Sequence, residues 1–221
     1  MNKLDASAYA FSKIYYYSEF EELLGKITLC YNDMVASDCQ LPNDENKIRD
    51  YLYVNYLNND NVLRKYKFGK YKFDKEIVED FGEGRVDIRI ISPNIFENKQ
   101  AYYIIECKRI DNINTQGNTG LNAEYVINGM NRFLKENKYS SFYGTNGLIG
   151  FIVSTLDINA NIRNINTLIK KHIIGNCIQD IKREDFMPNF PYQYSSNHTK
   201  QNGEKIKLYH LMYDFADKVL N

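Results

Sequence analysis

Apolar residues recur at helical spacing over the first part of the chain, with one short polar break. Between about 6 and 35 they follow three- and four-residue steps, which predicts one or two helices. The segment LPND (41–44) interrupts the pattern, and Asn43 or Asp44 is a suitable N-cap for a further helix at 45–57. The residues expected to face the core are Phe11, Ile14, Tyr15, Phe20, Leu23, Leu24, Ile27, Met34, Ile48, Tyr51 and Leu52.

The middle of the chain changes to strand-like patterns. Residues 63–80, LRKYKFGKYKFDKEIVED, alternate basic and aromatic side chains, and residues 84–91, GRVDIRII, alternate polar and apolar ones. Residues 101–110, AYYIIECKRI, are apolar on both faces, as expected of a central strand. The later elements that the pattern predicts are a helix at 121–137, a buried strand at 147–155, a helix at 158–172 and a hairpin at 192–215 that turns near Asn202 and Gly203.

Strands interleaved with helices predict the α/β class, with a mixed central sheet flanked by helices. An N-terminal helical segment precedes this core, and a C-terminal β-hairpin follows it. At 221 residues, without an internal repeat or a low-complexity linker, the chain is expected to form a single domain, 1–221. Its expected parts are the helical segment (1–40), the central core (41–155) and the C-terminal helix and hairpin (156–221).

Charge and cysteine content limit the partners and the structural sites that this chain is expected to have. The 28 basic residues balance 28 acidic ones, so a polyanion would have to bind a local basic patch. Four cysteines without a CxxC pair, and three histidines, argue against a structural zinc site or a disulfide framework. The N-terminus lacks the apolar core of a signal peptide, and no apolar run approaches the ~18 residues of a membrane helix. We expect a cytoplasmic protein with reduced thiols and no membrane partner.

The tripeptide Glu106-Cys107-Lys108 places two charges at the end of an apolar strand. In a strand, residues two apart share a face, so Glu106 and Lys108 point into the same space. The spacing alone carries little information, because the chain repeats it in other settings. Those repeats open or close helices or lie in polar stretches: Glu45-Asn46-Lys47, Glu97-Asn98-Lys99, Glu136-Asn137-Lys138 and Asp180-Ile181-Lys182.

The preceding strand supplies a second acid. If residues 85–91 pair with 101–108 as a hairpin, Asp87 approaches Glu106. Two close carboxylates repel each other unless they share a proton or bind a cation, and their oxygens suit Mg²⁺. A lysine beside them could hold a nucleophilic water or stabilise charge on a phosphate. The alternative is a structural ion pair at a strand end.

This arrangement, Asp87 followed after residues 88–105 by Glu106-Cys107-Lys108, resembles the PD-(D/E)xK nuclease superfamily over about 45–155. The resemblance implies a restriction endonuclease-like fold. It also implies that Asp87, Glu106 and the backbone carbonyl of Cys107 hold the metal and that Lys108 positions the attacking water. Arg85-Val86 stand where the family motif has its proline.

Glu45 is a third candidate acid, because the family often supplies one from the first core helix. On the helix at 45–57 it shares a stripe with Ile48 and Leu52, which places it at the inner edge. The alternative is a first-turn glutamate favoured by the helix dipole.

Basic residues outside the motif are candidates for phosphate contacts. The stretch at 64–75 places six basic residues among four aromatic ones, and Lys65, Lys67, Lys70 and Lys72 could follow a nucleic-acid backbone. The alternative is a half-buried strand pair with its lysines in water. Arg132, on the predicted helix after the motif, could contact a phosphate or form a surface salt bridge.

The sequence therefore predicts a Mg²⁺-dependent phosphodiesterase, with Mn²⁺ able to substitute. The resemblance favours a DNA endonuclease of restriction or antiviral-defence type, with DNA preferred over RNA. Double-strand cleavage suggests a homodimer, and a regulatory partner protein is compatible with the sequence. The alternatives are an RNase or a DNA-repair nuclease, and a nuclease-like nucleic-acid-binding or assembly subunit without catalysis.

Overall fold

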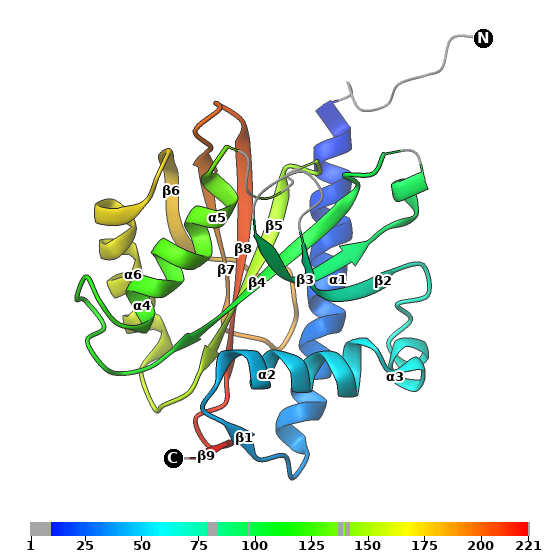
Figure 1. Cartoon of the computed structure of the whole chain (residues 1–221), viewed down its shortest axis with the longest axis horizontal. Coiled ribbons are helices and arrows are strands. Elements are labelled where there is room, and N and C mark those ends of the chain that lie inside the picture. Colours follow the sequence, from blue (N-terminus) through cyan, green and yellow to red (C-terminus); the bar gives the residue numbers. More distant parts are fainter. Residues whose placement is uncertain (1–9, 79–83, 97, 137–138, 140–141, 221) are drawn as a thin grey trace.

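A mixed β-sheet forms the middle of the protein, and helices cover both of its faces (Figure 1). The computed structural model describes residues 10–78, 84–96, 98–136, 139 and 142–220, with side chains from Lys13 onward. Within these ranges seven strands run in the order β2-β3-β4-β5-β8-β7-β6; β4–β5 and β5–β8 are parallel and the other pairs antiparallel. The strands are β2 Lys72–Val78, β3 Arg85–Ile91, β4 Tyr102–Ile110, β5 Thr145–Ile152, β6 Asn176–Arg183, β7 Gln193–Thr199 and β8 Lys205–Asp214.

The helices divide between the two faces of the sheet, and a two-residue parallel pair, β1 Leu41–Pro42 with β9 Val219–Leu220, lies apart from it. Helix α2 begins where the Asp44 side chain accepts a hydrogen bond of 2.9 Å from the backbone N–H of Lys47. The helical elements are α1 Ala10–Ala36, α2 Glu45–Leu52 with its π-helical continuation η2 Tyr53–Leu57, α3 Asp60–Lys65, the 3₁₀ turn η3 Pro93–Phe96, α4 Leu121–Glu124, the π-helical η4 Tyr125–Met130, α5 Asn131–Leu134 and α6 Ile158–His172.

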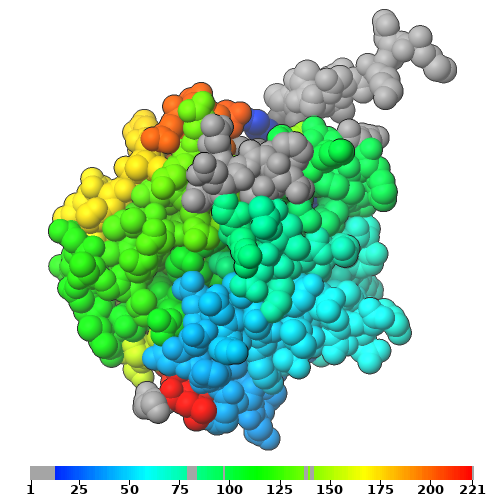
Figure 2. Space-filling view, viewed as in Figure 1, coloured from blue at the N-terminus to red at the C-terminus, as the bar shows by residue number. Residues whose placement is uncertain are grey.

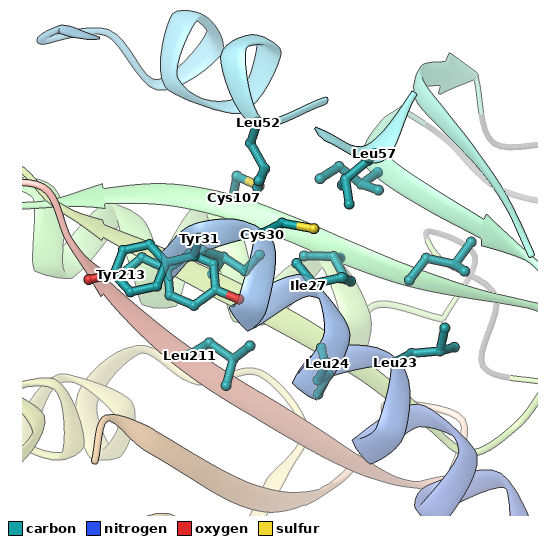
Figure 3. Close-up of a cluster of buried hydrophobic side chains, with 14 of the residues drawn as sticks. Leu23, Leu24, Ile27, Cys30, Tyr31, Leu52, Leu57, Cys107, Leu211 and Tyr213 are labelled. Atoms are coloured by element: carbon teal, nitrogen blue, oxygen red, sulfur yellow. The ribbon is translucent and has the colours of Figure 1, made fainter. Parts of the chain in front are cut away.

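Each face of the sheet carries its own hydrophobic cluster. On one face α1 and α2 pack against β4 and β8; Figure 3 shows Leu23, Leu24 and Ile27 of α1 in this cluster with Leu211 and Tyr213. On the other face α4, η4, α5 and α6 cover the sheet. The buried residues there include Val126, Met130, Phe133, Leu134, Ile162, Ile165, Leu168 and Ile169. Burial on both faces explains why the first part of β4, residues 102–105, is apolar at every position.

Most predicted elements are present, including the helix after Asp44, the strands at 85–91 and 102–110, and the C-terminal hairpin. The hairpin turns at Gly203, whose positive φ of 88° suits a glycine. Its second strand lies beside β5 inside the sheet, and β6, which was not predicted, adds a further strand beside β7. Nothing in the described part of the chain is a helix long and apolar enough to cross a membrane.

Two sequence predictions were wrong. The strand-like pattern at 63–71 does not form a strand: the Asn59 side chain caps a new helix, α3, and β2 begins only at Lys72, while residues 79–80 of this stretch lie outside the described residues. Lys67 lies in the intervening turn with a positive φ of 56°. In addition, Ile14 and Tyr15 are exposed, because the buried stripe of α1 begins at Phe20. The side chain of Phe11 lies outside the described residues.

Candidate active site

Strands β3 and β4 pair over only part of their length. The register runs from Ile91↔Tyr102 to Ile88↔Ile105, and the start of β3 continues beside β2 alone. Beyond this point β4 runs on to Ile110 beside β5. We call the stretch Glu106–Ile110, where β4 has lost its β3 neighbour, the open edge of β4. The predicted hairpin therefore exists, and it diverges at the motif.

Two carboxylates take the place of the missing strand. The backbone N–H of Cys107 donates to Oδ2 of Asp87 at 2.8 Å, and that of Arg109 donates to Oε2 of Glu45 at 2.9 Å. Because successive N–H groups of a strand alternate between its edges, these are the groups that β3 would otherwise have bonded. Asp87 and Glu45 therefore satisfy the open edge of β4.

The ammonium of Lys108 lies among three oxygens. It is 2.8 Å from Oε1 of Glu106, and it donates to the carbonyl of Cys107 at 2.8 Å and to Oε1 of Glu45 at 2.9 Å. Burial lowers the pKa of Lys108, but the charges of Glu106, Asp87 and Glu45 outweigh it, so the pKa rises and the group stays protonated. One cation is thus held by oxygens from a helix and a strand.

Glu106 is completely buried, with 0% of its surface exposed. Its Oε1 is also 2.8 Å from Nη1 of Arg132, while the hydroxyl of Tyr139 donates to Oε2 at 2.8 Å. Burial, together with the charge of Asp87, raises the pKa of Glu106 to about 7, although Lys108 and Arg132 act in the opposite direction. A buried acid with two cations and a second acid nearby is typical of a functional site, although structural ion-pair networks have the same signature.

Asp87 has a buried partner that the sequence did not reveal. Arg49, 2% exposed, donates from Nη1 to Oδ1 of Asp87 at 2.8 Å and also contacts Asp50 and Glu76. Burial lowers the pKa of Arg49, but hydrogen bonds to Asp50 and Asp87 outweigh it and raise the pKa. The available signal was its spacing, because Arg49 lies four residues after Glu45 and so on the same side of α2.

Cys107 contributes its backbone, not its thiol, to the open edge. Its side chain is in the cluster formed with α1 and α2, and Figure 3 shows it beside Leu52. Burial raises the pKa of the Cys107 thiol well above its usual range. The Cys107 side chain is therefore a packing residue that faces away from Glu106.

Three of the other basic candidates have acidic partners. Lys65 contacts Asp33 at 2.6 Å, Lys70 contacts Glu19 at 2.9 Å, and Lys72 contacts Asp74 at 3.0 Å. The carbonyl of Lys67 accepts a hydrogen bond from Lys26. Their role in nucleic-acid binding stays a prediction, whereas the strand-like pattern is wrong for Lys65, Lys67 and Lys70, because β2 begins at Lys72.

Several oxygens at this edge belong to ligand types that hard divalent cations prefer. Carboxylate oxygens of Asp87 and Glu106 and the carbonyl of Cys107 are ligands of the type that Mg²⁺ and Mn²⁺ prefer, with water completing the shell. The oxygens of Glu106, Glu45 and Cys107 already surround one cation at this edge, the ammonium of Lys108. Among the described residues no group of three or more histidine, cysteine, aspartate or glutamate side chains is arranged to hold a metal ion.

In the space-filling view the blue-to-cyan part of the chain that includes α2 borders the green middle part on this face of the molecule (Figure 2).

Comparison with protein-family models, with curated proteins and with solved structures found no match for this chain.

Proposed function

We propose that this protein is a metal-dependent nuclease with a restriction endonuclease-like fold, and that it acts as a DNA endonuclease. The observation that carries the proposal is the convergence of Asp87, Glu106, Glu45 and Lys108 at one open strand edge. These residues come from β3, β4 and α2, and contacts of 2.8–2.9 Å link them through Lys108 and the backbone of β4. Acids that can hold a metal and a lysine that can stabilise charge on a phosphate are residue types that can support metal-dependent phosphodiester hydrolysis.

The residues divide the work by their chemistry. Asp87, Glu106 and the carbonyl of Cys107 would hold Mg²⁺ or Mn²⁺, which when bound makes water more acidic and neutralises charge on a phosphate. Lys108 remains protonated. If a metal took up the oxygens of Glu106 and Cys107, the Lys108 ammonium would be left to orient the attacking water and to stabilise the charge that develops on the phosphate oxygens. The water oxygen bonds to phosphorus as the bond to the leaving oxygen breaks. Arg132, 33% exposed, can contact a neighbouring phosphate.

Two rival functions use the same residues. An RNase or DNA-repair nuclease would share the chemistry and differ in its substrate surface. A non-catalytic nucleic-acid-binding or assembly subunit has one observation in its favour: Asp87 and Glu45 already satisfy backbone N–H groups at the open edge, a role that needs no catalysis.

The test is a cleavage screen with Mg²⁺ or Mn²⁺ over single- and double-stranded DNA and RNA. Asp87→Ala and Lys108→Ala should abolish cleavage, and Lys108→Ala should still bind nucleic acid. Lys207→Ala is a matched control, because Lys207 is also largely buried and lies between two glutamates, Glu21 and Glu184. Wild-type protein without metal-dependent cleavage of any substrate would leave the binding or assembly function as the better explanation.

A further inference from the structure

The hydroxyl of Tyr139 lies where β3, β4 and α5 meet. It accepts a hydrogen bond from Nη1 of Arg132 at 2.8 Å, and two acceptors lie within reach of its own proton. These are Oε2 of Glu106 at 2.8 Å and the backbone carbonyl of Arg85 at 2.6 Å. Tyr139 is buried, so water does not substitute for these contacts. Its ring packs against Phe133 with centroids 5.2 Å apart, which fixes the position of the hydroxyl.

The phenol has one proton to share between two acceptors. An ionised carboxylate is the stronger acceptor, because the hydrogen bond is then charge-assisted. The contacts at the other oxygen of Glu106 are different in kind, because Lys108 and Arg132 each lie 2.8 Å from Oε1 as ion-pair partners. Tyr139 therefore supplies the hydroxyl hydrogen bond that fixes Oε2 of Glu106.

We infer that Tyr139 is a positioning residue of the candidate active site. Its hydroxyl holds Oε2 of Glu106 on the α5 side, so that Oε1 is turned toward Lys108. Tyr139 acts through Glu106 and itself contacts neither nucleic acid nor metal. The catalytic consequence rests on the proposed function, whereas the effect on divalent-cation binding can be measured without it. Groups that orient a metal ligand in this way affect metal affinity or activity by ~10- to 100-fold when removed.

The chain provides a matched control for deleting this hydroxyl. Tyr103, on β4, is fully buried and donates to Oε2 of Glu19 at 2.7 Å, at the α1 side of the sheet. Tyr139→Phe and Tyr103→Phe each remove one tyrosine–glutamate hydrogen bond from the interior. Both variants should fold, with comparable losses of stability. An effect specific to the site will appear in Tyr139→Phe alone.

The experiment measures the Mn²⁺ dissociation constant of the full chain by calorimetry, and kcat and KM on the best substrate of the cleavage screen. We expect Tyr139→Phe to raise the Mn²⁺ dissociation constant ~10-fold or more and to lower kcat at a fixed Mn²⁺ concentration, with KM for nucleic acid changed less than ~2-fold. Tyr103→Phe should stay within ~2-fold of wild type in all three quantities, as expected away from a metal site.

Equal Mn²⁺ affinities for Tyr139→Phe and Tyr103→Phe would overturn the inference and leave Tyr139 a packing residue. If the wild type binds Mn²⁺ but cleaves nothing, the proposed function fails, and the Mn²⁺ comparison still decides the role of Tyr139. A wild type that neither binds Mn²⁺ nor cleaves refutes both.

Discussion

The backbone N–H of Cys107 donates a hydrogen bond of 2.8 Å to the carboxylate of Asp87, just beyond the last paired residues of β3 and β4. The same carboxylate accepts from the buried guanidinium of Arg49 at its other oxygen, also at 2.8 Å. Asp87 thus completes the edge of a strand as well as offering a charge to the site. Any test of its chemistry has to separate these two roles.

Substitutions of Asp87 should separate its role at the strand edge from its role in the site, because the first affects the free energy of unfolding and the second affects cleavage. Asp87→Asn keeps one acceptor oxygen, so it can satisfy either Cys107 or Arg49 but not both. Asp87→Ala satisfies neither, and each buried donor left without a partner costs ~1–3 kcal/mol. We expect the unfolding free energy to decrease in the order wild type, Asn, Ala, and metal-dependent cleavage to be lost in both variants. Urea unfolding and the cleavage assay measure the two effects, and cleavage by folded Asp87→Asn would contradict a metal-binding role.

Lys108→Met keeps the aliphatic stem of Lys108 and removes its charge. Glu106 then retains Arg132 but loses the ammonium, and breaking a buried ion pair in this way costs ~3–5 kcal/mol. The loss should be greater at pH 8 than at pH 6, because the protonated acid at lower pH needs no partner. Cleavage should fall by at least ~10²-fold. The double variant with Glu106→Gln should recover most of the stability in urea unfolding, and no recovery would show that the two side chains are not energetically coupled.

Gly129 allows the stem of Lys108 to lie close to η4. A Cβ at this position would be 3.3 Å from Cγ of Lys108 and 3.2 Å from Leu148. Gly129→Ala should therefore gain little of the ~1 kcal/mol that alanine normally adds to a helix, and it should lower kcat by displacing Lys108. Gly25→Ala in α1 is the control, because its Cβ would meet Met187 at an ordinary 3.5 Å. That variant should be more stable by up to ~1 kcal/mol with unchanged kcat, and equal kcat in the two variants would argue against the positioning of Lys108 by η4.

Two buried histidines should make the protein sensitive to acid. His210 lies 2.8 Å from the hydroxyls of both Tyr125 and Ser196, and His198 lies 2.7 Å from that of Ser196. Burial lowers the pKa of His198 to about 4, against the opposing charge of Asp180. Burial, with the charge of His198, lowers that of His210 to about 3. Between these pKa values and 6.5, the unfolded chain binds more protons than the folded protein does. The stability that the two neutral histidines contribute is therefore complete above pH 6.5 and is lost as the pH falls toward 4.

The direction of this pH dependence can be tested with two variants that change the pH dependence of the unfolding free energy in opposite directions. His198→Gln should reduce the rise of unfolding free energy between pH 4.5 and 6 by ~1.4 kcal/mol per pH unit. Glu106 has a raised pKa, so its contribution is present below pH 4.5 and is lost as the pH rises toward 7. Glu106→Gln should therefore make the rise steeper. Urea unfolding across this range measures both slopes, and parallel slopes in all three proteins would show that these groups do not titrate as proposed.

The sequence was most informative where a short-range repeat decides the outcome. Alternation in 84–91 and the apolar run at 101–110 predicted β3 and β4, and the two-residue period placed Glu106 and Lys108 on one face. Helical spacing likewise placed Glu45 at the inner edge of α2. The stretch at 63–80 was misassigned because a basic–aromatic alternation also fits a short helix and turn, and the cap at Asn59 determined which formed.

The sequence by itself determined most of the elements, the inward faces of α2, β3 and β4, and the motif, because these follow from backbone periodicity and local capping. Only the tertiary structure decided that Arg49 binds Asp87, that Tyr139 holds Glu106, and that β8 lies beside β5. These contacts join residues separated by 33 or more positions, so their energies depend on how whole elements pack and not on local spacing. The divergence of β3 from β4, which opens the edge that these side chains occupy, is likewise a property of the assembled sheet.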